Sequence, residues 1–446
     1  MEHQQKPRSK KEMTLYGLTM VAIGSCIGSG IFLTPAHIAG YLKNPIFILL
    51  IWGIGGLVAV TGALTFAELG ARFPGAGGIY VYLKEAYNDF VAFLFGWANL
   101  LVVNTGAIAA LSIACAYYLG FIIPLSETGK IVIAVSLIVI VTIINIFGVK
   151  KGELFSNVFT GLKLLGIVGI IVTGILFGTT EIKYFELNNY EVPTNLTSAF
   201  GLALIGVIFS YGGFQHASFL AGEAKNPART VPLAMIIGTL VVACIYILTN
   251  IAYLHLLPVS AIANSERVAA DAINTFLPIG GIVIAIIIVI STFGTAGIFT
   301  LSAPRIYFAM AQDGIFFRKL AEIHPKYKTP VFAILIQSSV AILLLLFWKT
   351  FENLLAYLIY IDSIFLTLAA ISIFVFRRRK KFSGDTYKTL GYPLTPLIFI
   401  SVSLFLIVSI LIEKPAQAVA GLSLLLLGVP VYYYFKRKNS ISSKNS

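Results

Sequence analysis

The residues whose types and spacing point most clearly to chemistry form a glycine-rich stretch near the start of the chain. Residues 24–30 read Gly-Ser-Cys-Ile-Gly-Ser-Gly and interrupt an apolar run at 15–41 that is long enough to cross a bilayer. Lipid offers no hydrogen-bond partners, so backbone that leaves the helix at mid-membrane persists only where protein, water or a ligand satisfies it. This interruption is therefore predicted to form part of a binding site.

A second interruption of the same kind occurs near the middle of the chain. Residues 209–216 read Phe-Ser-Tyr-Gly-Gly-Phe-Gln-His within an apolar run at 196–222. A helix that restarts near Gly30 would present free N–H groups and the positive end of its dipole, which suit a carboxylate. A helix that stops between Phe209 and Gly212 would present free carbonyls, which suit an ammonium. Together the two interruptions predict a site for the zwitterion of a free α-amino acid.

Glycine has a specific purpose at the first interruption. A side chain at Gly28 or Gly30 would keep a ligand away from the backbone. The alternative is that Gly24 and Gly28 form a Gly-x-x-x-Gly motif, which is a common device for helix packing. Two interruptions at corresponding positions favour the binding interpretation.

Lys163 is a further functional candidate, because it lies about nine residues, or roughly 14 Å, into an apolar run at 153–178. A lysine at this depth costs on the order of 3 kcal/mol on insertion scales and is rarely incidental. We hypothesise that its ammonium ties this run to the loosened backbone of the first run and to hydroxyls such as those of Ser291 or Thr295. There it would replace a sodium ion electrostatically. Loss of its proton would couple function to protons, whereas a permanent charge would make it a fixed strut compatible with exchange.

For the other polar residues in the apolar runs, the sequence gives weaker evidence of a functional role. Asp362 is also costly, and it faces either the ligand pathway or a wet cavity outside it. Glu68 and Arg72 are expected to pair at the membrane interface. His37 and His216 flank the interruptions and are expected to pack as neutral side chains, with no metal and no cofactor. All three cysteines fall inside apolar runs, which predicts neither disulfides nor a zinc site; they are Cys26, Cys115 and Cys244.

Membrane-spanning helices must position these residues. The chain is 58% apolar and 11% charged, and its mean hydropathy of +0.90 excludes a soluble globule. A helix needs about 20 residues to cross the hydrocarbon, and the runs are continuous rather than alternating, which excludes barrel strands. We therefore expect an all-α membrane protein with twelve transmembrane helices, at about 13–41, 45–70, 88–119, 130–148, 153–178, 196–222, 231–255, 278–309, 331–347, 353–376, 393–412 and 416–435.

The positions of the interruptions predict an internal repeat. They fall in the first and sixth runs, so each would begin a unit of five helices. Five is an odd number of crossings, so the second unit is inverted, a pattern typical of secondary transporters that bind at the repeat interface. We predict a 5+5 inverted repeat with helices 1 and 6 unwound at mid-membrane. Its units are a cytoplasmic N-terminal tail at 1–12, the first repeat at 13–178, the second repeat at 196–376, two extra helices at 393–435 and a cytoplasmic tail at 436–446.

The net charge of +13 is explained by topology rather than by nucleic-acid binding. Of the lysines and arginines, 25 lie in the tails and loops on one side of the twelve runs and six on the other, with Lys163 inside a run. The positive-inside rule then makes both termini cytoplasmic. The same rule accounts for the basic cluster at 377–381.

At these residues the sequence resembles the amino acid–polyamine–organocation superfamily of permeases, particularly its L-type amino acid transporter branch and bacterial relatives. Residues 23–32 resemble the first-helix motif of that family, and residues 209–214 resemble its sixth-helix motif. Residues 222–232 resemble the cytoplasmic loop that follows, and 73–80 and 391–396 also match. The resemblance covers almost the whole chain.

The resemblance implies a leucine-transporter-like fold and a set of site residues. It assigns the backbone amides of Ser29 and Gly30 to the substrate carboxylate and the carbonyls of Cys26, Phe209 and Gly212 to the amino group. Lys163 matches a lysine of several members. The full set of substrate-binding candidates is Cys26, Gly28, Ser29, Gly30, Phe209, Ser210, Gly212 and Phe214, with Lys163, Ser291 and Thr295 in coupling or structural roles.

Two departures from the family pattern bear on specificity and partners. Many relatives carry a tryptophan where this chain has Phe214, and Cys26 replaces a larger apolar residue, so the pocket volume differs. Eukaryotic members that pair with a single-span partner use a cysteine between spans three and four. Residues 119–130 contain none, so no disulfide-linked heavy-chain partner is expected.

The sequence thus predicts a secondary active transporter of free, neutral amino acids, working by alternating access in a cell membrane, with a bacterial inner membrane as the expected location. Exchange and proton-coupled uptake both remain open, and sodium coupling is disfavoured because Lys163 would supply positive charge. A polyamine or cationic amino acid permease is the nearer alternative, for which Asp362 is the only acidic candidate. A channel and an integral membrane enzyme are more distant alternatives, and no enzymatic activity is expected.

Overall fold

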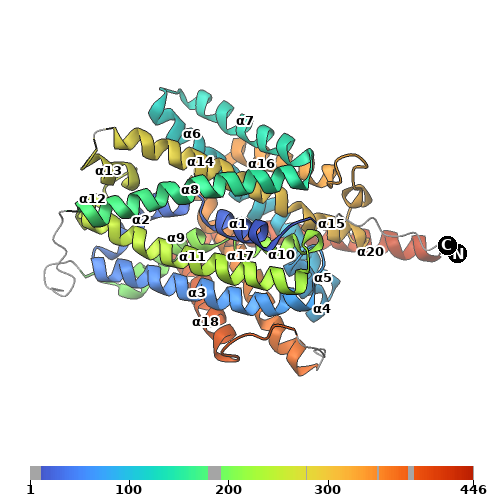
Figure 1. The fold of residues 1–446 in the computed structure, drawn as a ribbon. Helices are drawn as coiled ribbons and strands as arrows, with labels where there is room; N and C mark the ends of the chain where they lie inside the picture. The colour runs from blue at the N-terminus through green and yellow to red at the C-terminus, as the bar shows by residue number, and fades with distance from the viewer. Residues whose placement is uncertain (1–11, 179–191, 278, 349–350, 380–385, 445–446) are drawn as a thin grey trace.

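The computed structural model describes residues 12–178, 192–277, 279–348, 351–379 and 386–444. Within these ranges the chain forms helices and no strands, and its only extended pairing is an isolated parallel bridge between Met13 and Ala224. The long helices lie side by side in one bundle (Figure 1). The chain is therefore an all-helical protein whose described part has the apolar helices of a multi-pass membrane protein.

The helices follow the apolar runs of the sequence closely. In chain order they are α1 Leu15–Cys26, α2 Gly30–Leu42, α3 Pro45–Arg72, α4 Ile79–Ala86, α5 Asp89–Ala98, the π segment η1 Asn99–Val103, α6 Asn104–Ile122, α7 Glu127–Ile146, α8 Val149–Phe177, α9 Leu196–Tyr211, α10 His216–Phe219, η3 Ala221–Glu223, α11 Pro227–Leu256, α12 Val259–Ala263, α13 Val268–Asn274, α14 Gly280–Ser302, α15 Pro304–Gln312, η4 Arg318–Ala321, α16 Val331–Trp348, α17 Phe351–Arg378, α18 Leu394–Glu413, α19 Pro415–Leu426 and α20 Gly428–Lys444.

Ten helical segments of the described chain are long and apolar enough to cross a membrane. Two shorter apolar helices, Leu196–Tyr211 and Val331–Phe347, occupy the places of the sixth and ninth predicted runs. The ten are Leu15–Leu42, Pro45–Arg72, Asp89–Ile122, Glu127–Ile146, Lys151–Phe177, Pro227–Leu256, Gly280–Gln312, Tyr357–Arg378, Leu394–Glu413 and Pro415–Lys438.

Several predicted runs are subdivided in the structure. The run at 88–119 contains the π segment η1, and the side chain of Asn104, the first residue of α6, donates to Asn99 Oδ1 at 2.5 Å. The run at 278–309 divides where Pro304, which has no N–H to donate, begins α15. Short helices such as α4, α12 and α13 lie in segments for which the apolar runs predicted no helix.

The first helix lies at the centre of the bundle. In the most apolar stretch of Leu15–Leu42, 89% of the residues are buried, against 33% for Lys151–Phe177. Figure 1 shows α1 between α8 and α11, and both helices pack against it. Outer helices expose large apolar side chains, such as Leu165 at 72% and Phe347 at 83%. Such a surface suits lipid rather than water.

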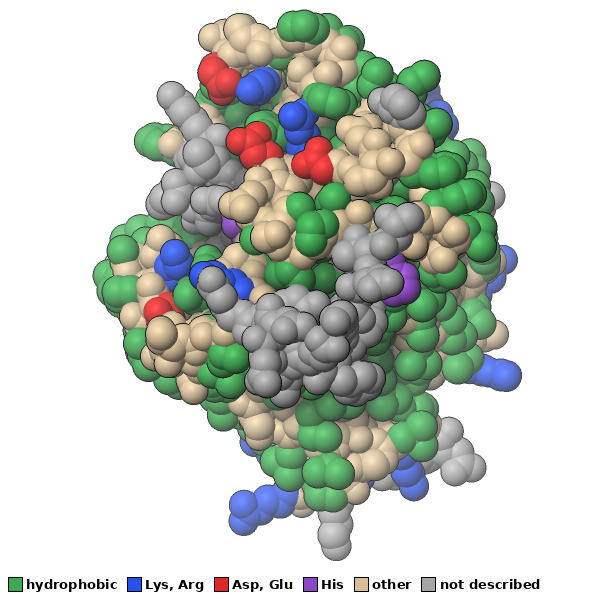
Figure 2. Space-filling model, turned by 90° about the vertical axis from the view of Figure 1, so that its left-hand side faces the viewer, with side chains coloured by type: hydrophobic (Ala, Val, Ile, Leu, Met, Phe, Trp, Pro, Cys, Tyr) green, Lys and Arg blue, Asp and Glu red, His purple; other side chains and the backbone are tan. Residues whose placement is uncertain are grey.

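One end of the bundle carries α12 and α13, and acidic and basic side chains lie on this face (Figure 2). Tyr117, near the end of α6, donates to Glu266 at 3.1 Å there, and the Arg267 guanidinium lies over the Phe121 ring. Polar side chains and backbone, drawn tan, lie between the charged groups, and apolar side chains lie mainly toward the margins of this face. These contacts join the end of α6 to the segment between α12 and α13.

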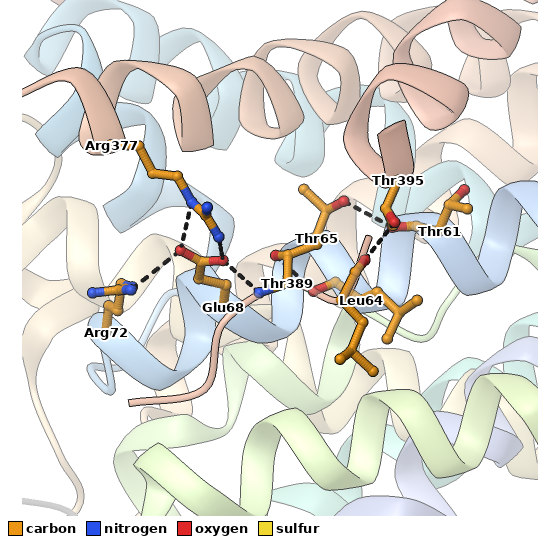
Figure 3. A network of polar contacts seen from close by, with 9 residues as sticks. Thr61, Leu64, Thr65, Glu68, Arg72, Arg377, Thr389 and Thr395 are labelled. Atoms are coloured by element: carbon orange, nitrogen blue, oxygen red, sulfur yellow. Dashed lines mark hydrogen bonds and ion pairs between the residues drawn. The ribbon is translucent and has the colours of Figure 1, made fainter. Parts of the chain in front are cut away.

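The opposite end is fastened by a network around the buried Glu68 (Figure 3). The predicted partner Arg72 donates to Glu68 at 3.2 Å, and Arg377 donates a stronger bond of 2.7 Å from α17. The backbone N–H of Thr389 supplies a further bond at 2.6 Å. The Arg377 guanidinium also lies 3.7 Å from the centre of the Tyr392 ring. Because its partners come from α3, α17 and the segment before α18, this carboxylate joins three elements with its charge fully compensated.

A second buried ion pair lies close to the start of the first helix. Arg305 at the start of α15 binds Glu223 of η3, with 2.8 Å between Nη2 and Oε1. Residues 12 and 13 donate their N–H groups to the Glu223 carbonyl, and the Lys225 N–H donates to the Met13 carbonyl at 2.9 Å. The segment that enters α1 is thereby tied to the segment that follows α10.

Candidate functional site

The chain leaves the helical path at the first glycine-rich stretch. Helix α1 ends at Cys26 and α2 begins at Gly30. The Gly28 N–H turns back to the Cys26 carbonyl at 2.9 Å. Among the described hydrogen bonds none is donated by the N–H of Ser29 or Gly30. The N-terminal end of α2 therefore presents backbone donors and the positive end of a helix dipole, as an anion requires.

The second stretch shows a matching gap. Helix α9 ends at Tyr211 and α10 begins at His216. Gly213 has φ +128, a conformation that favours glycine. The Gly212 N–H donates to Ile208 at 2.9 Å, whereas its own carbonyl accepts no described hydrogen bond. The end of α9 thus presents an acceptor, as an ammonium requires.

The two gaps touch each other. Ser25 Oγ, at the end of α1, lies 2.8 Å from the Gly213 carbonyl. A Cβ atom built on Gly213 would lie 2.6 Å from the carbonyl carbon and oxygen of Ser25. A Cβ built on Gly30 would lie 2.5 Å from Ser210 Oγ and 2.8 Å from Ser210 Cα. Glycine is needed at both positions because the two backbones approach this closely, and the same approach sets the anion-attracting end beside the cation-attracting end.

Lys163 reaches the first gap from α8. Its side chain is fully buried, and its ammonium donates to the Gly24 carbonyl at 2.9 Å and the Ile27 carbonyl at 2.6 Å. A third bond of 2.6 Å joins it to Thr295 Oγ1 on α14. All three protons of the ammonium are therefore used. The lysine satisfies carbonyls that the end of α1 leaves without helical partners.

Helix α14 completes the support of the same carbonyls. Thr295 Oγ1 lies 2.9 Å from the Gly24 carbonyl and 2.8 Å from that of Ile27, and its single proton serves one of them at a time. Ser291 Oγ lies 3.1 Å from the carbonyls of both Ile27 and Gly28. Ser291 therefore supports the gap directly rather than through the lysine.

Gly24 also serves the packing role that the Gly-x-x-x-Gly motif suggested. A Cβ on Gly24 would lie 2.1 Å from Thr160 Oγ1 of α8 and 2.5 Å from Ile298 Cδ1 of α14. Gly28 is less crowded, with its nearest neighbour, Leu111, at 3.1 Å. Packing and ligand access are thus divided along the stretch, because the close helix contact is at Gly24 and the open N–H groups are at Ser29 and Gly30.

Tyr246 is a site residue that the sequence analysis missed. It is buried on α11, and its hydroxyl lies 2.9 Å from the Cys26 carbonyl and 3.0 Å from the Ser210 carbonyl. One side chain therefore bridges the ends of α1 and α9. The chain has 21 tyrosines, and nothing in the sequence around Tyr246 distinguishes it from the others.

We expect Tyr246→Phe to lower amino acid transport while leaving the protein folded. The change removes one hydroxyl shared by two backbone carbonyls, and a neutral hydrogen bond contributes about 0.5–1.5 kcal/mol, so the loss should be roughly 2- to 12-fold. Transport would be measured as labelled amino acid exchange in liposomes. Tyr16→Phe is the matched control, because the Tyr16 side chain is 62% exposed. Equal rates for the two variants would show that the bridge has no role.

The remaining predicted residues fall into different surroundings. Ser29 Oγ is buried and has no hydrogen-bond partner in the structure. Phe214 stacks on Phe66, with 6.0 Å between ring centres. His216 Nδ1 lies 2.5 Å from Ser302 Oγ, in a buried contact. The thiols of Cys26, Cys115 and Cys244 are free, and no cluster of histidine, cysteine and acidic side chains among the described residues could hold a metal.

Two narrow cavities adjoin the second gap. One, of about 50 Å³, is lined by Phe209, Gly212 and Gly213 together with side chains of α5, η1, α6 and α17. The other, of about 40 Å³, lies toward α3 and α18 and is lined by Gly212 and Phe214. Gln215 and Asp362 contribute to both. The gap at the end of α9 therefore opens onto space that contains a carboxylate.

Comparison with known proteins decides the family. A family model described as amino acid permease matches residues 13–433. The chain belongs to the amino acid permease family. The match covers both gaps, all of the candidate site residues and nearly every apolar helix of the permease, which is accordingly a membrane transporter of amino acids rather than a member of an enzyme family.

Individual relatives place the permease more narrowly. It is 34% identical to the serine/threonine exchanger SteT of Bacillus subtilis over 97% of this chain and 98% of the relative. It is 29% identical to the b(0,+)-type amino acid transporter 1 of Mus musculus, covering 95% of this chain and 88% of the relative. It is also 29% identical to the large neutral amino acids transporter small subunit 2 of Homo sapiens, covering 95% and 80%. The permease is therefore related to the L-type amino acid transporters, as its motifs indicated.

Proposed function

We propose that the permease exchanges free neutral amino acids across a cell membrane by alternating access, with the substrate zwitterion held between the two gaps. The observation that carries this proposal is the contact between the N-terminal end of α2 and the C-terminal end of α9. The donors of Ser29 and Gly30 suit the carboxylate, and the Gly212 carbonyl suits the ammonium. Cys26, Gly28, Phe209, Ser210 and Phe214 complete the proposed pocket.

The proposed architecture is twelve transmembrane helices arranged as a 5+5 inverted repeat with two extra helices. The repeats would be 13–178 and 196–376, followed by 393–435. Spans one and six would each be unwound at mid-membrane, at residues 27–29 and 212–215. Support comes from the matching positions of the two gaps and from the short helix α9, which ends where the gap begins.

Neutral substrates are favoured because the residues of both gaps include no carboxylate or basic side chain other than His216. In the proposed pocket Lys163 is a fixed strut, since its three protons are all donated to the protein. Its charge lies beside the carbonyls of Gly24 and Ile27, and it would disfavour a sodium ion at that place. The names of the relatives, which include an exchanger and two amino acid transporters, support exchange as the mode of transport.

The proposed location is the inner membrane of a bacterium, with both termini cytoplasmic. The distribution of lysine and arginine between the loops supports this orientation. The Glu68 network and the Glu223–Arg305 pair would then lie at the cytoplasmic end. No disulfide-linked partner is proposed, because the loop that carries the linking cysteine in some relatives has none here.

Counterflow in liposomes tests the proposed function. Purified protein is reconstituted into vesicles loaded with one unlabelled amino acid, and uptake of the same labelled amino acid is followed. With equal pH on both sides, we expect saturable uptake that internal substrate accelerates and that is strongest for neutral amino acids. Uptake that rises linearly with concentration would indicate a channel, and preference for lysine or putrescine would favour the cationic or polyamine alternative. Absence of counterflow for every amino acid would overturn the proposal.

A further inference from the structure

Asp362 is an acidic side chain that the proposed substrate site does not use. It lies on α17 within the apolar segment Tyr357–Arg378. Asp362 lines the cavity toward α6 and also the cavity toward α18. Within the described ranges it makes no hydrogen bond and no ion pair. It is therefore a single acid placed between two small spaces, both of which reach the gap after α9.

An isolated charge at this depth is costly. Insertion scales give about 2.5–3.5 kcal/mol for a charged residue at the centre of a membrane helix, so such groups are neutralised or hydrated. Apart from His216 and Tyr211, the other polar side chains in the cavity walls are neutral amides and hydroxyls: Asn99, Asn104, Gln215, Ser363 and Ser403. None of them compensates a full negative charge. The carboxylate therefore needs a cation that the described protein does not provide.

The titratable side chains that line these cavities or bond to α17 have hydrogen-bond partners elsewhere, and none forms a described ion pair with Asp362. His216 shares a cavity with Asp362, but its Nδ1 is bound to Ser302 Oγ at 2.5 Å. Tyr211 lines the other cavity, and its hydroxyl donates to the Trp52 carbonyl at 3.1 Å. Tyr87 donates to the Leu368 carbonyl on α17 at 2.8 Å.

Charged groups elsewhere on the packed helices lie at a distance or have partners of their own. Arg377 is fifteen residues along α17 from Asp362, roughly 22 Å away, and it binds Glu68. Lys84 on α4 pairs with Asp313 at 2.7 Å. The other titratable side chains of these helices include Tyr80, Tyr82 and Glu85 of α4, Asp89 of α5, Cys115, Tyr117 and Tyr118 of α6, Tyr357 and Tyr360 of α17 itself, and Glu413 of α18. Helix α19 has none.

The size of the cavities limits which cation fits. They measure about 50 and 40 Å³, and one buried water needs about 10–15 Å³. Each space therefore holds a few waters. Aromatic and branched side chains, including Phe95, Phe299 and Leu358, form the rest of the first cavity. A chain of waters that carries a proton fits here, whereas an extended organic cation does not.

We propose that Asp362 is a proton-binding site that links the protonation of the permease to amino acid transport. A proton from water on one side of the membrane adds to the carboxylate, which makes it neutral while the cavities are closed. The same proton returns to water when the site opens to the other side, so no other reactant is needed. This proposal rests on the proposed function, because a coupled proton requires a transported substrate.

The experiment separates coupling from transport by measuring two activities of the same vesicles. Counterflow at equal pH on both sides reports substrate exchange. Uptake into empty vesicles with an acidic exterior reports coupling, for which a gradient of one pH unit supports about tenfold accumulation when one proton accompanies each substrate. We expect the unmodified permease to do both and Asp362→Asn to keep counterflow while losing accumulation. Asp362→Glu should retain both, and Glu127→Gln is the control, since Glu127 lies exposed at the start of α7.

Several results would overturn the proton site. If Asp362→Asn accumulates as much amino acid as the unmodified permease, the coupled proton binds elsewhere, for example at Lys163. Absence of accumulation in the unmodified permease, with normal counterflow, would leave the proposed function intact and remove the proton. A changed preference between lysine and neutral substrates in Asp362→Asn, with coupling preserved, would make the carboxylate a substrate contact. A second measurement applies if Asp362→Asn lacks counterflow. The number of protons taken up when substrate binds is then measured for purified Asp362→Asn and Asp362→Glu in detergent. Equal proton uptake by the two variants would contradict the proposal.

Discussion

Lys163→Ala is expected to lower amino acid exchange by at least about 30-fold. The change removes an ammonium that donates to two buried carbonyls and to Thr295. A hydrogen bond to a charged group contributes about 1.5–3 kcal/mol, so the bonds to the two carbonyls amount to roughly 3–6 kcal/mol, and 2 kcal/mol is already about 30-fold. The cost falls on the gap between α1 and α2, so the geometry of the anion site should be lost with it. Counterflow in liposomes measures the effect.

The control for this prediction is Lys130→Ala. Lys130 forms an ion pair of 2.7 Å with Glu127, whose side chain is 88% exposed. Such surface pairs are worth about 0–1 kcal/mol, so Lys130→Ala should exchange amino acids nearly normally. Size-exclusion profiles of both variants would show whether each remains folded. Exchange by folded Lys163→Ala within about twofold of the unmodified rate would end the strut hypothesis.

Gly30→Ala should weaken substrate binding by at least about fivefold. Its methyl group would lie 2.5 Å from Ser210 Oγ and 2.8 Å from Ser210 Cα, so the two gaps must move apart. Overpacking of this kind costs about 1–3 kcal/mol, or roughly 5- to 150-fold in affinity, and the methyl group also covers the open N–H groups. The measurement is calorimetric binding of a neutral amino acid to purified protein.

Gly40→Ala is a matched control within the same helix. A Cβ on Gly40 meets no atom within 4 Å, and alanine is a better helix former than glycine by about 1 kcal/mol. Gly40→Ala should therefore bind substrate normally and be equally or more stable. Unchanged affinity in Gly30→Ala would contradict the backbone site. It would show that substrate binding does not depend on the close contact between α2 and Ser210.

The sequence predicts the helices well because membrane helices are defined by long apolar runs, which can be read one residue at a time. It predicts the ends of a helix less well where an apolar run also contains glycine or proline residues that break the helix. The run at 196–222 yields a helix of only sixteen residues, because Gly212 and Gly213 end it and the chain is not helical again until His216. Pro304 divides another run for a similarly local reason.

The depth of a charged residue in an apolar run predicts that it has partners, but it does not identify them. The position of Lys163 in an apolar run is visible in the sequence, and so is the need for partners. That those partners include the carbonyls of Gly24 and Ile27 depends on the packing of α8 against α1, which only coordinates show. Tyr246 gives no such signal, because a tyrosine in an apolar run is ordinary and both of its acceptors are backbone atoms.

The Glu68 network shows the same limit at the end of the bundle. The partner Arg72 is four residues away on one helix, and that spacing is recognisable in the sequence. Arg377 is 309 positions away, and Thr389 donates a backbone N–H from the segment before α18. Residues that are distant in sequence meet through packing that no local pattern encodes. From the sequence alone, the basic cluster that contains Arg377 therefore indicates only topology.

A structure of the permease with a bound neutral amino acid would test the central claim most directly. The account predicts one carboxylate oxygen about 3 Å from the N–H groups of Ser29 and Gly30, and the ammonium at a similar distance from the Gly212 carbonyl. It also predicts that Lys163 keeps its bonds to the end of α1. An amino acid bound elsewhere, with both gaps closed by protein contacts, would contradict the account.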